Sequence, residues 1–137
     1  MHAVHGYFEH DADIGIIGRG DTLEQSFVSA AHAMFAIQSD LDSVRSLEEI
    51  DIDFEEGDVE LALVRWLNAL LAVSRERGVV LCEFDIEREG SRWRGRARGE
   101  RWHARLERGT EVKGATLTML SVSRGAGGWE ARCVVDV

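Results

Sequence analysis

Apolar and polar residues alternate along several stretches of the chain, which is the pattern of strands with one buried face. Residues 7–20 predict a short strand, a polar turn and then an apolar strand that glycines close. Residues 48–56 predict a further strand, because apolar side chains there alternate with carboxylates. From residue 79 to the end, the pattern is that of strands throughout.

Two other stretches repeat their apolar residues with helical spacing. Thr22 and Gln25 have the spacing of a capping box and precede an amphipathic segment that extends to residue 38. Asp58 can cap a second helix, and Gly78 can end it. Two helices with several antiparallel strands and no long crossovers predict an α+β fold of two layers, in which the helices pack on a mostly antiparallel sheet.

The arginine-rich segment at residues 88–109 suggests nucleic-acid binding, because tryptophans are interleaved with its cations. A two-residue turn at Gly90 and Ser91 gives a different interpretation, since it places the acids of one strand opposite the arginines of the next. The expected opposite pairs are Glu89 with Arg92, Glu87 with Arg94, Asp85 with Arg96, Glu83 with Arg98 and, on the inner face, Cys82 with Gly99. Arginines whose charge is neutralised by neighbouring acids attract phosphate only weakly. We therefore favour a solvent-exposed ladder of ion pairs over a nucleic-acid site.

Composition limits the number of domains, the location and the partners of this protein. The chain has 137 residues, of which 45% are hydrophobic and 30% charged, and we expect a single domain over residues 1–137. No apolar run approaches the length of a membrane span and the first residues do not resemble a secretory signal, so we expect a cytoplasmic protein. The net charge of -9 disfavours association with polyphosphate and favours either solubility alone or a basic or cationic partner. Cys82 and Cys133 lie in apolar strand-like segments, where a disulfide is possible but not needed.

Four titratable residues gather just before the first apolar strand: Glu9, His10, Asp11 and Asp13. On spacing alone, a turn between strands explains them best. The alternative is a cation site completed by Asp136 and the terminal carboxylate of Val137, because oxygen ligands suit a hard ion such as calcium or magnesium. A metal-dependent phosphoesterase with His10 as its base is the enzyme hypothesis that corresponds to this site.

Lysine occurs only once among the sixteen basic residues, at Lys113. An ammonium group supplies a compact point charge that the planar guanidinium of arginine does not supply. A functional lysine and chance explain this composition equally well.

Four segments together resemble the archease family in order and spacing, across essentially the whole chain. They are "YFEHDADIGIIGRGDTLEQSFVSAAHAMF", "DVELALVRWLNALL", "EVKGAT" and "GGWEARCVVDV". The resemblance implies an accessory protein of the GTP-dependent tRNA-splicing RNA ligase, not an enzyme in its own right. Such a protein promotes guanylylation of the ligase and its multiple turnover in tRNA splicing and RNA repair, and it meets RNA only through the ligase.

The resemblance also implies a set of site residues. Asp13, Asp136 and Val137 correspond to the ligands of a divalent cation, for which we expect calcium in preference to magnesium. We expect His10 to contact these ligands and not the ion itself. Asp13, Lys113 and Asp136 correspond to residues required for ligase activation. The chain departs from the family pattern after its lysine segment, where Leu117 and Thr118 replace a tyrosine and a histidine, and His103 is a candidate replacement for the lost imidazole. An RNA-binding chaperone is the third hypothesis.

Overall fold

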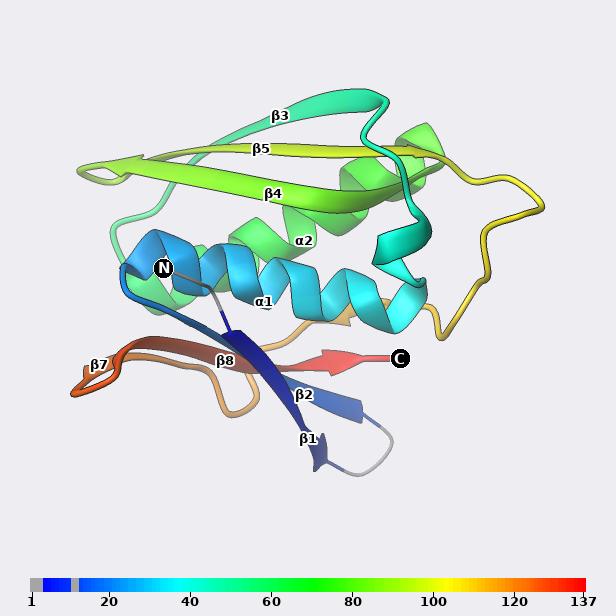
Figure 1. Ribbon diagram of the computed structural model, residues 1–137. Coiled ribbons are helices and arrows are strands. Elements are labelled where there is room, and N and C mark those ends of the chain that lie inside the picture. Colours follow the sequence, from blue (N-terminus) through cyan, green and yellow to red (C-terminus); the bar gives the residue numbers. More distant parts are fainter. Residues whose placement is uncertain (1–3, 11–12) are drawn as a thin grey trace.

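The structure of this protein is a computed structural model that describes residues 4–10 and 13–137. Figure 1 shows two helices that lie between two sheets. The elements in chain order are β1 (Val4–His10), β2 (Asp13–Gly20), α1 (Leu23–Gln38), the short 3-10 helix η1 (Leu41–Ser43), β3 (Glu48–Glu55), α2 (Val59–Arg77), β4 (Val79–Glu89), β5 (Arg92–Arg101), β6 (Gly114–Ala115), β7 (Ser121–Gly125) and β8 (Gly128–Asp136). None of the described helices is long and apolar enough to cross a membrane.

The predicted α+β class, with two helices packed on antiparallel strands, is confirmed, but the strands form two sheets. One sheet has the order β1-β2-β8-β6, with β7 also paired to β8, and the other has the order β3-β5-β4. We call them the lower and the upper sheet, after their places in Figure 1. The molecule therefore has three layers where a two-layer arrangement was expected. Alternation identifies the buried face of each strand, but it does not identify the strands that pair.

Both helices fit between the sheets because glycines let them approach closely. A Cβ atom on Gly18 of β2 would lie 2.2 Å from the carbonyl oxygen of Ser26 in α1. A Cβ atom on Gly95 of β5 would lie 2.1 Å from the indole ring of Trp66 in α2. The core consequently combines residues of both helices and both sheets, among them Phe27, Trp66 and Trp93, and it leaves these rings without solvent exposure.

The helix ends follow the sequence prediction. The Thr22 side chain accepts a hydrogen bond from the backbone of Gln25, whose own side chain accepts in return from the backbone N–H of Thr22. The Asp58 side chain accepts from two backbone N–H groups at the start of α2. Gly78 ends α2 with a φ of 65°, a left-handed conformation that glycine adopts without a steric penalty. The start of α2 and its end are therefore encoded locally.

The β4–β5 hairpin has the predicted register over most of its length. Glu89 pairs with Arg92 and Glu83 pairs with Arg98, as expected, and Gly90 has a φ of 60° in the turn. The predicted pairing of Cys82 with Gly99 is wrong, because a bulge at this point places Leu81 opposite Gly99. A bulge inserts one unpaired residue, which alternation alone does not reveal. Both cysteines, Cys82 and Cys133, are free thiols.

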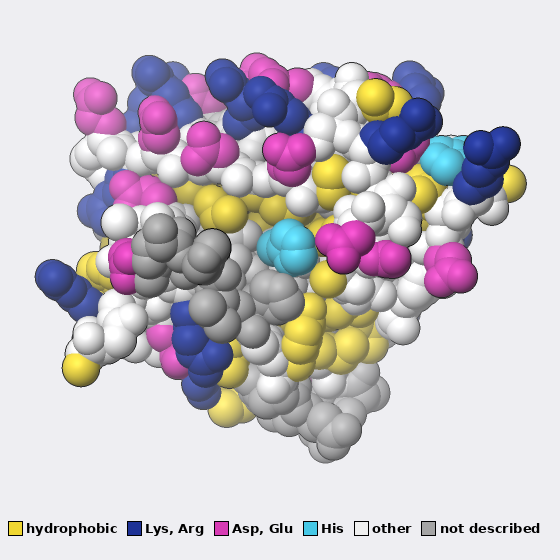
Figure 2. Space-filling view, viewed as in Figure 1, with side chains coloured by type: hydrophobic (Ala, Val, Ile, Leu, Met, Phe, Trp, Pro, Cys, Tyr) yellow, Lys and Arg dark blue, Asp and Glu magenta, His cyan; other side chains and the backbone are white. Residues whose placement is uncertain are grey.

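The arginines of β5 have acidic neighbours on both sides, because β3 pairs along the other edge of this strand. Arg92 lies 2.7 Å from Asp53, and Arg98 lies 2.8 Å from Glu49. Figure 2 shows acidic and basic side chains mixed along the side of the molecule where the upper sheet lies. The predicted ladder of ion pairs is therefore present. Acids of both β3 and β4 neutralise its arginines, where the prediction had acids of β4 alone.

Candidate functional site

Three segments that are distant in sequence meet at one end of the lower sheet. Ile14 of β2 pairs with Val135 of β8, so the next residues along the two strands, Asp13 and Asp136, lie opposite each other. Gly114 of β6 pairs with Asp136 on the other side of β8. Figure 1 shows that the C-terminus and the beginning of β2 lie at the same end of this sheet. The fold thus places two of the predicted metal ligands on adjacent strands.

The two aspartates share one face of the sheet. Successive side chains on a strand alternate between faces, so Asp13 and Asp136 both point away from the face that carries Ile14 and Val135. Opposite residues on antiparallel strands have Cβ atoms about 4.5–5.5 Å apart. Asp13 is half-buried and Asp136 is exposed, and within the described part of the chain no cation forms an ion pair with either carboxylate.

Lys113 is fixed beside Asp136 by its backbone. Its N–H donates to the carbonyl oxygen of Asp136 at 2.8 Å, and its own carbonyl oxygen accepts from the guanidinium of Arg75 at 2.7 Å. The neighbouring residue, Val112, donates its N–H to the side-chain oxygen of Gln38 at 3.0 Å. The peptide groups on both sides of the lysine are therefore held by α1, α2 and β8, and its exposed ammonium group extends from a constrained position.

Two residues of α2 position this lysine segment, and the sequence prediction missed both roles. The amide of Asn68 donates to the carbonyl oxygen of Ala115 at 3.1 Å and accepts from its N–H at 2.8 Å. Arg75 bonds the carbonyl groups of Val112 and Lys113. A partly buried asparagine in the middle of an amphipathic helix was the available signal, because a polar group in such a position requires partners.

The carboxylates of Asp13 and Asp136 are oxygen donors, the type of ligand that a hard divalent cation takes. Two adjacent carboxylates repel each other unless a cation offsets their charge, and oxygen atoms are the ligands that calcium and magnesium prefer. Asp136 is followed directly by Val137, whose carboxylate would be the third donor. Among the residues that the structure describes, no group of three or more His, Cys, Asp and Glu side chains could hold a metal. A metal here would therefore depend on the terminal carboxylate and on solvent oxygens.

His10 pairs with Asp13 in the backbone ladder of β1 and β2, next to these carboxylates. Its side chain, like that of Glu9, lies outside the part of the chain that the structure describes, and so does Asp11. The role of His10 behind the metal ligands stays a prediction.

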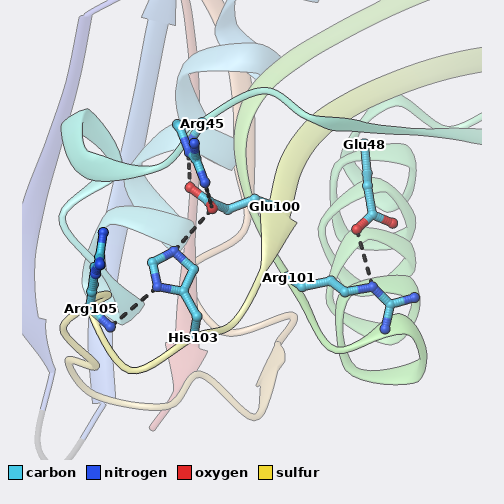
Figure 3. Close-up of polar contacts among 6 residues, drawn as sticks. All are labelled: Arg45, Glu48, Glu100, Arg101, His103 and Arg105. Atoms are coloured by element: carbon cyan, nitrogen blue, oxygen red, sulfur yellow. Dashed lines mark hydrogen bonds and ion pairs between the residues drawn. The ribbon is translucent and has the colours of Figure 1, made fainter.

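His103 belongs to a different polar cluster (Figure 3). Its Nε2 lies 3.0 Å from Oε1 of Glu100, and its Nδ1 accepts from the backbone N–H of Arg105 at 3.2 Å. Glu100 is only 3% exposed and also accepts from the backbone N–H of Arg45 at 2.7 Å. Both ring nitrogens of His103 are thus occupied in anchoring the loop that follows β5. The partners of this imidazole are not the residues around Lys113 and Asp136.

Replacement of Glu100 by Gln is expected to lower the urea midpoint of unfolding at neutral pH. The hydrogen bond from the N–H of Arg45, helped by the Arg45 and His103 side chains, lowers the pKa of the Glu100 carboxyl below its usual value of 4.5. A carboxyl whose pKa is lower in the folded state stabilises the fold above its unfolded-state pKa and loses this contribution as the pH falls through its folded-state pKa. The difference between wild type and Glu100→Gln should therefore shrink below pH 4.5.

Urea unfolding at several pH values checks this expectation. Glu107→Gln, an exposed glutamate of the same loop, is the matched control and should show a small difference. A difference for Glu100→Gln that does not vary with pH would contradict the assigned role of the Glu100 carboxylate.

Comparison with known proteins places nearly the whole chain in one family. A model of the Archease protein family matches residues 5–137. Protein archease of Methanosarcina mazei is 35% identical over 137 residues and covers 96% of this chain and 94% of that protein. Protein archease of Pyrococcus furiosus is 36% identical over 137 residues and covers 96% of each chain.

Solved structures share the fold of this chain. The solution structure of Methanobacterium thermoautotrophicum protein 1598 has a TM-score of 0.81 and 28% identity, and the match covers 97% of this chain and 98% of that one. The crystal structure of an archease from Thermotoga maritima, described as a possible chaperone, has a TM-score of 0.67 and 23% identity, with 95% and 94% covered. The resemblance inferred from the four sequence segments is confirmed: the chain belongs to the archease family.

Proposed function

We propose that this archease is an accessory activator of the GTP-dependent tRNA-splicing RNA ligase in the cytoplasm. It promotes guanylylation of the ligase and its multiple turnover in tRNA splicing and RNA repair, and it performs no ligation itself. The observation that carries this proposal is the convergence of Asp13, Lys113 and Asp136 at one end of the lower sheet of an archease. The description of the Thermotoga maritima protein as a possible chaperone also fits a protein that acts on another protein.

The lysine supplies the feature that the ligase would recognise. The backbone bonds to Asp136 and Arg75 hold Lys113 in place before any partner arrives. A preorganised charge loses less conformational entropy on binding than a flexible one. Stronger contact with the ligase conformation that accepts the guanylyl group shifts the ligase population toward that conformation.

We further propose that Asp13, Asp136 and the terminal carboxylate of Val137 hold a divalent cation, calcium in preference to magnesium. Such an ion, when bound, supplies the positive charge that offsets three neighbouring carboxylates. Calcium takes about six to eight oxygen ligands, so water or oxygen atoms of the ligase complete the set. His10, which pairs with Asp13, is proposed to orient this carboxylate.

Multiple-turnover RNA ligation by the cognate ligase tests the proposed function. With GTP and divalent metal present, substoichiometric amounts of this protein should raise the number of RNA joins made per ligase molecule. The same assay with a pre-guanylylated ligase should show a gain only after the first turnover. No gain at any ratio of the two proteins would refute the activator.

The other two hypotheses receive no support from a specific observation. The phosphoesterase hypothesis predicts that the purified protein alone hydrolyses phosphate esters. A reaction with this protein but without the ligase is therefore the control that tests it. An RNA-binding chaperone predicts RNA affinity that falls steeply with salt. The acidic strands β3 and β4 on both sides of the β5 arginines disfavour RNA binding.

A further inference from the structure

The loop between β5 and β6, yellow in Figure 1, forms a hollow together with the C-terminal ends of both helices. The volume of this hollow is about 440 Å³. Its lining includes Gln38 of α1, Arg75 and Gly78 at the end of α2, and Trp102 and Arg108 of the loop. Sites for small molecules commonly have volumes of about 300–1,000 Å³, so the hollow is large enough to hold such a ligand.

Hydrogen bonds fix the walls of the hollow. The N–H of Gly109 donates to the carbonyl oxygen of Gln38 at 2.8 Å, and the N–H of Thr110 donates to that of Ile37 at 3.0 Å. A Cβ atom on Gly109 would lie 2.3 Å from the same oxygen of Ile37, so a glycine is what permits this close approach of the loop to α1. The hollow is therefore formed before any ligand binds, which reduces the entropy that binding costs.

The side chain of Arg75 is held at the hollow by the backbone of the lysine segment. Its Nη2 donates to the carbonyl oxygens of Val112 and Lys113. These bonds leave the N–H donors of Nε and Nη1 available. Within the described part of the chain, no carboxylate forms an ion pair with Arg75.

An aromatic ring holds the second arginine. The guanidinium carbon of Arg108 lies 4.0 Å from the centre of the Trp102 ring, and Trp102 itself packs against the core. Stacking of this kind orients a guanidinium group but does not neutralise its charge. Of the residues that the structure describes, no acid pairs with Arg108 either.

The lining of the hollow has a positive net charge in an acidic protein. Glu111 is the carboxylate among the lining residues, and it faces two guanidinium groups, whereas the whole chain has a net charge of -9. The end of α2 adds partial negative charge, but its carbonyl groups already accept hydrogen bonds. The N–H of Gly78 donates to two of them, and the carbonyl oxygen of Gly78 accepts from the N–H of Trp102 at 3.0 Å. The hollow therefore attracts an anion.

We propose that this hollow binds a small phosphate monoester, whose phosphate group accepts hydrogen bonds from Arg75 and Arg108. A guanidinium group donates two parallel hydrogen bonds to two oxygen atoms of an anion. One such group uses both oxygens of a carboxylate. A phosphate monoester has three terminal oxygens and nearly two negative charges at neutral pH, so it can satisfy two guanidinium groups. The remaining volume accommodates the organic part of the ester.

Isothermal titration calorimetry at constant ionic strength tests the site, with phenyl phosphate as the probe and benzoate as the matched carboxylate. Wild type should bind phenyl phosphate at least tenfold more tightly than benzoate. Arg108→Gln should raise the dissociation constant of phenyl phosphate at least tenfold, and Arg108→Lys should restore only part of this affinity, because an ammonium group keeps the charge without the planar fork. Arg124→Gln is the matched control and should change nothing, because Arg124 is an exposed arginine of β7 outside the hollow.

Glu111→Gln should change the affinity in the opposite direction. This substitution removes the carboxylate from the lining, so the dissociation constant of phenyl phosphate should fall severalfold. Glu111 is exposed, so the urea midpoint of unfolding should stay close to that of wild type. The stacking of Arg108 on Trp102 is untouched in this variant, which keeps the test decisive even where Arg108→Gln disturbs the loop. Unchanged or weaker binding by Glu111→Gln would contradict the site.

The other outcomes are equally decisive. Equal affinity for phenyl phosphate and benzoate would overturn the preference for phosphate, and unchanged affinity in Arg108→Gln would overturn the site. Inorganic phosphate that binds more tightly than the ester would assign the hollow to the free ion and overturn the monoester. Binding of a single-stranded oligoribonucleotide without binding of phenyl phosphate would assign the two arginines to nucleic acid and overturn it as well. None of these measurements includes the ligase, so the phosphate site and the proposed activator stand or fall separately.

Discussion

Asp136→Asn is expected to reduce activation of the ligase and affinity for calcium together, by at least about tenfold each, because it removes a charged ligand. Asp13→Asn should have the same effect, since the two aspartates lie opposite each other on adjacent strands. The expected change in stability reverses sign with calcium. Without calcium the variants should unfold at equal or higher temperature, because one of two repelling carboxylates has been neutralised. With calcium the wild type should be the more stable protein, because an ion bound only by the folded state stabilises it.

Thermal unfolding with calcium and with a chelator, alongside the ligation assay, measures both effects. Asp85→Asn is the matched control, because Asp85 is an exposed carboxylate on the upper sheet. A fusion after Val137 converts its terminal carboxylate into a neutral peptide group and should weaken calcium binding as well. Full activation by both aspartate variants would contradict the assigned role of this site, whatever their calcium affinity.

Trp66→Ala is expected to destabilise the fold by about 3–5 kcal/mol, the usual cost of removing a fully buried large aromatic side chain. Trp66 has no solvent exposure, and its ring packs directly against Gly95 of the upper sheet. Its indole N–H also donates to the carbonyl oxygen of Phe27 in α1 at 3.1 Å. Since domains of this size are stable by about 5–15 kcal/mol, the variant should lose about a fifth or more of its folding stability.

Urea unfolding followed by circular dichroism measures this loss. Trp66→Phe keeps an aromatic ring and removes the hydrogen bond, so it should cost less, about 1–3 kcal/mol. Leu47→Ala, at an exposed position, should stay within about 0.5 kcal/mol of wild type. A cost below about 1 kcal/mol for Trp66→Ala would show that the site collapses around the missing ring.

The local elements of this fold could be predicted from the sequence because short-range interactions encode them. The capping box at Thr22, the left-handed end of α2 at Gly78 and the turn at Gly90 each depend on residues within one turn of chain. The register of the arginine ladder followed from the turn, because a two-residue loop fixes which residues are opposite. The bulge at Cys82 was missed, because one unpaired residue leaves no mark in the alternation.

The candidate site was predicted only in part, and for a different reason. Its residue types could be named from the family resemblance, yet their proximity depends on the pairing of β2 with β8 and of β6 with β8. The contributions of Asn68 and Arg75 were not predicted, because hydrogen bonds between a helix and a distant loop have no signature in spacing. The anchoring of His103 by Glu100, three residues before it, was not predicted either, because it depends on the path of the backbone after β5.

The sequence by itself determined the helices, most of the strands, the family and the chemical nature of the candidate ligands, because period, capping and motif are properties of the chain. Only the tertiary structure decided that the strands form two sheets around the helices, and that Asp13, Lys113 and Asp136 meet at one end of the lower sheet. Only the tertiary structure brought Arg75 of α2 and Arg108 of the loop after β5 to the same hollow. These features depend on long-range pairing and burial, which emerge when the whole chain packs.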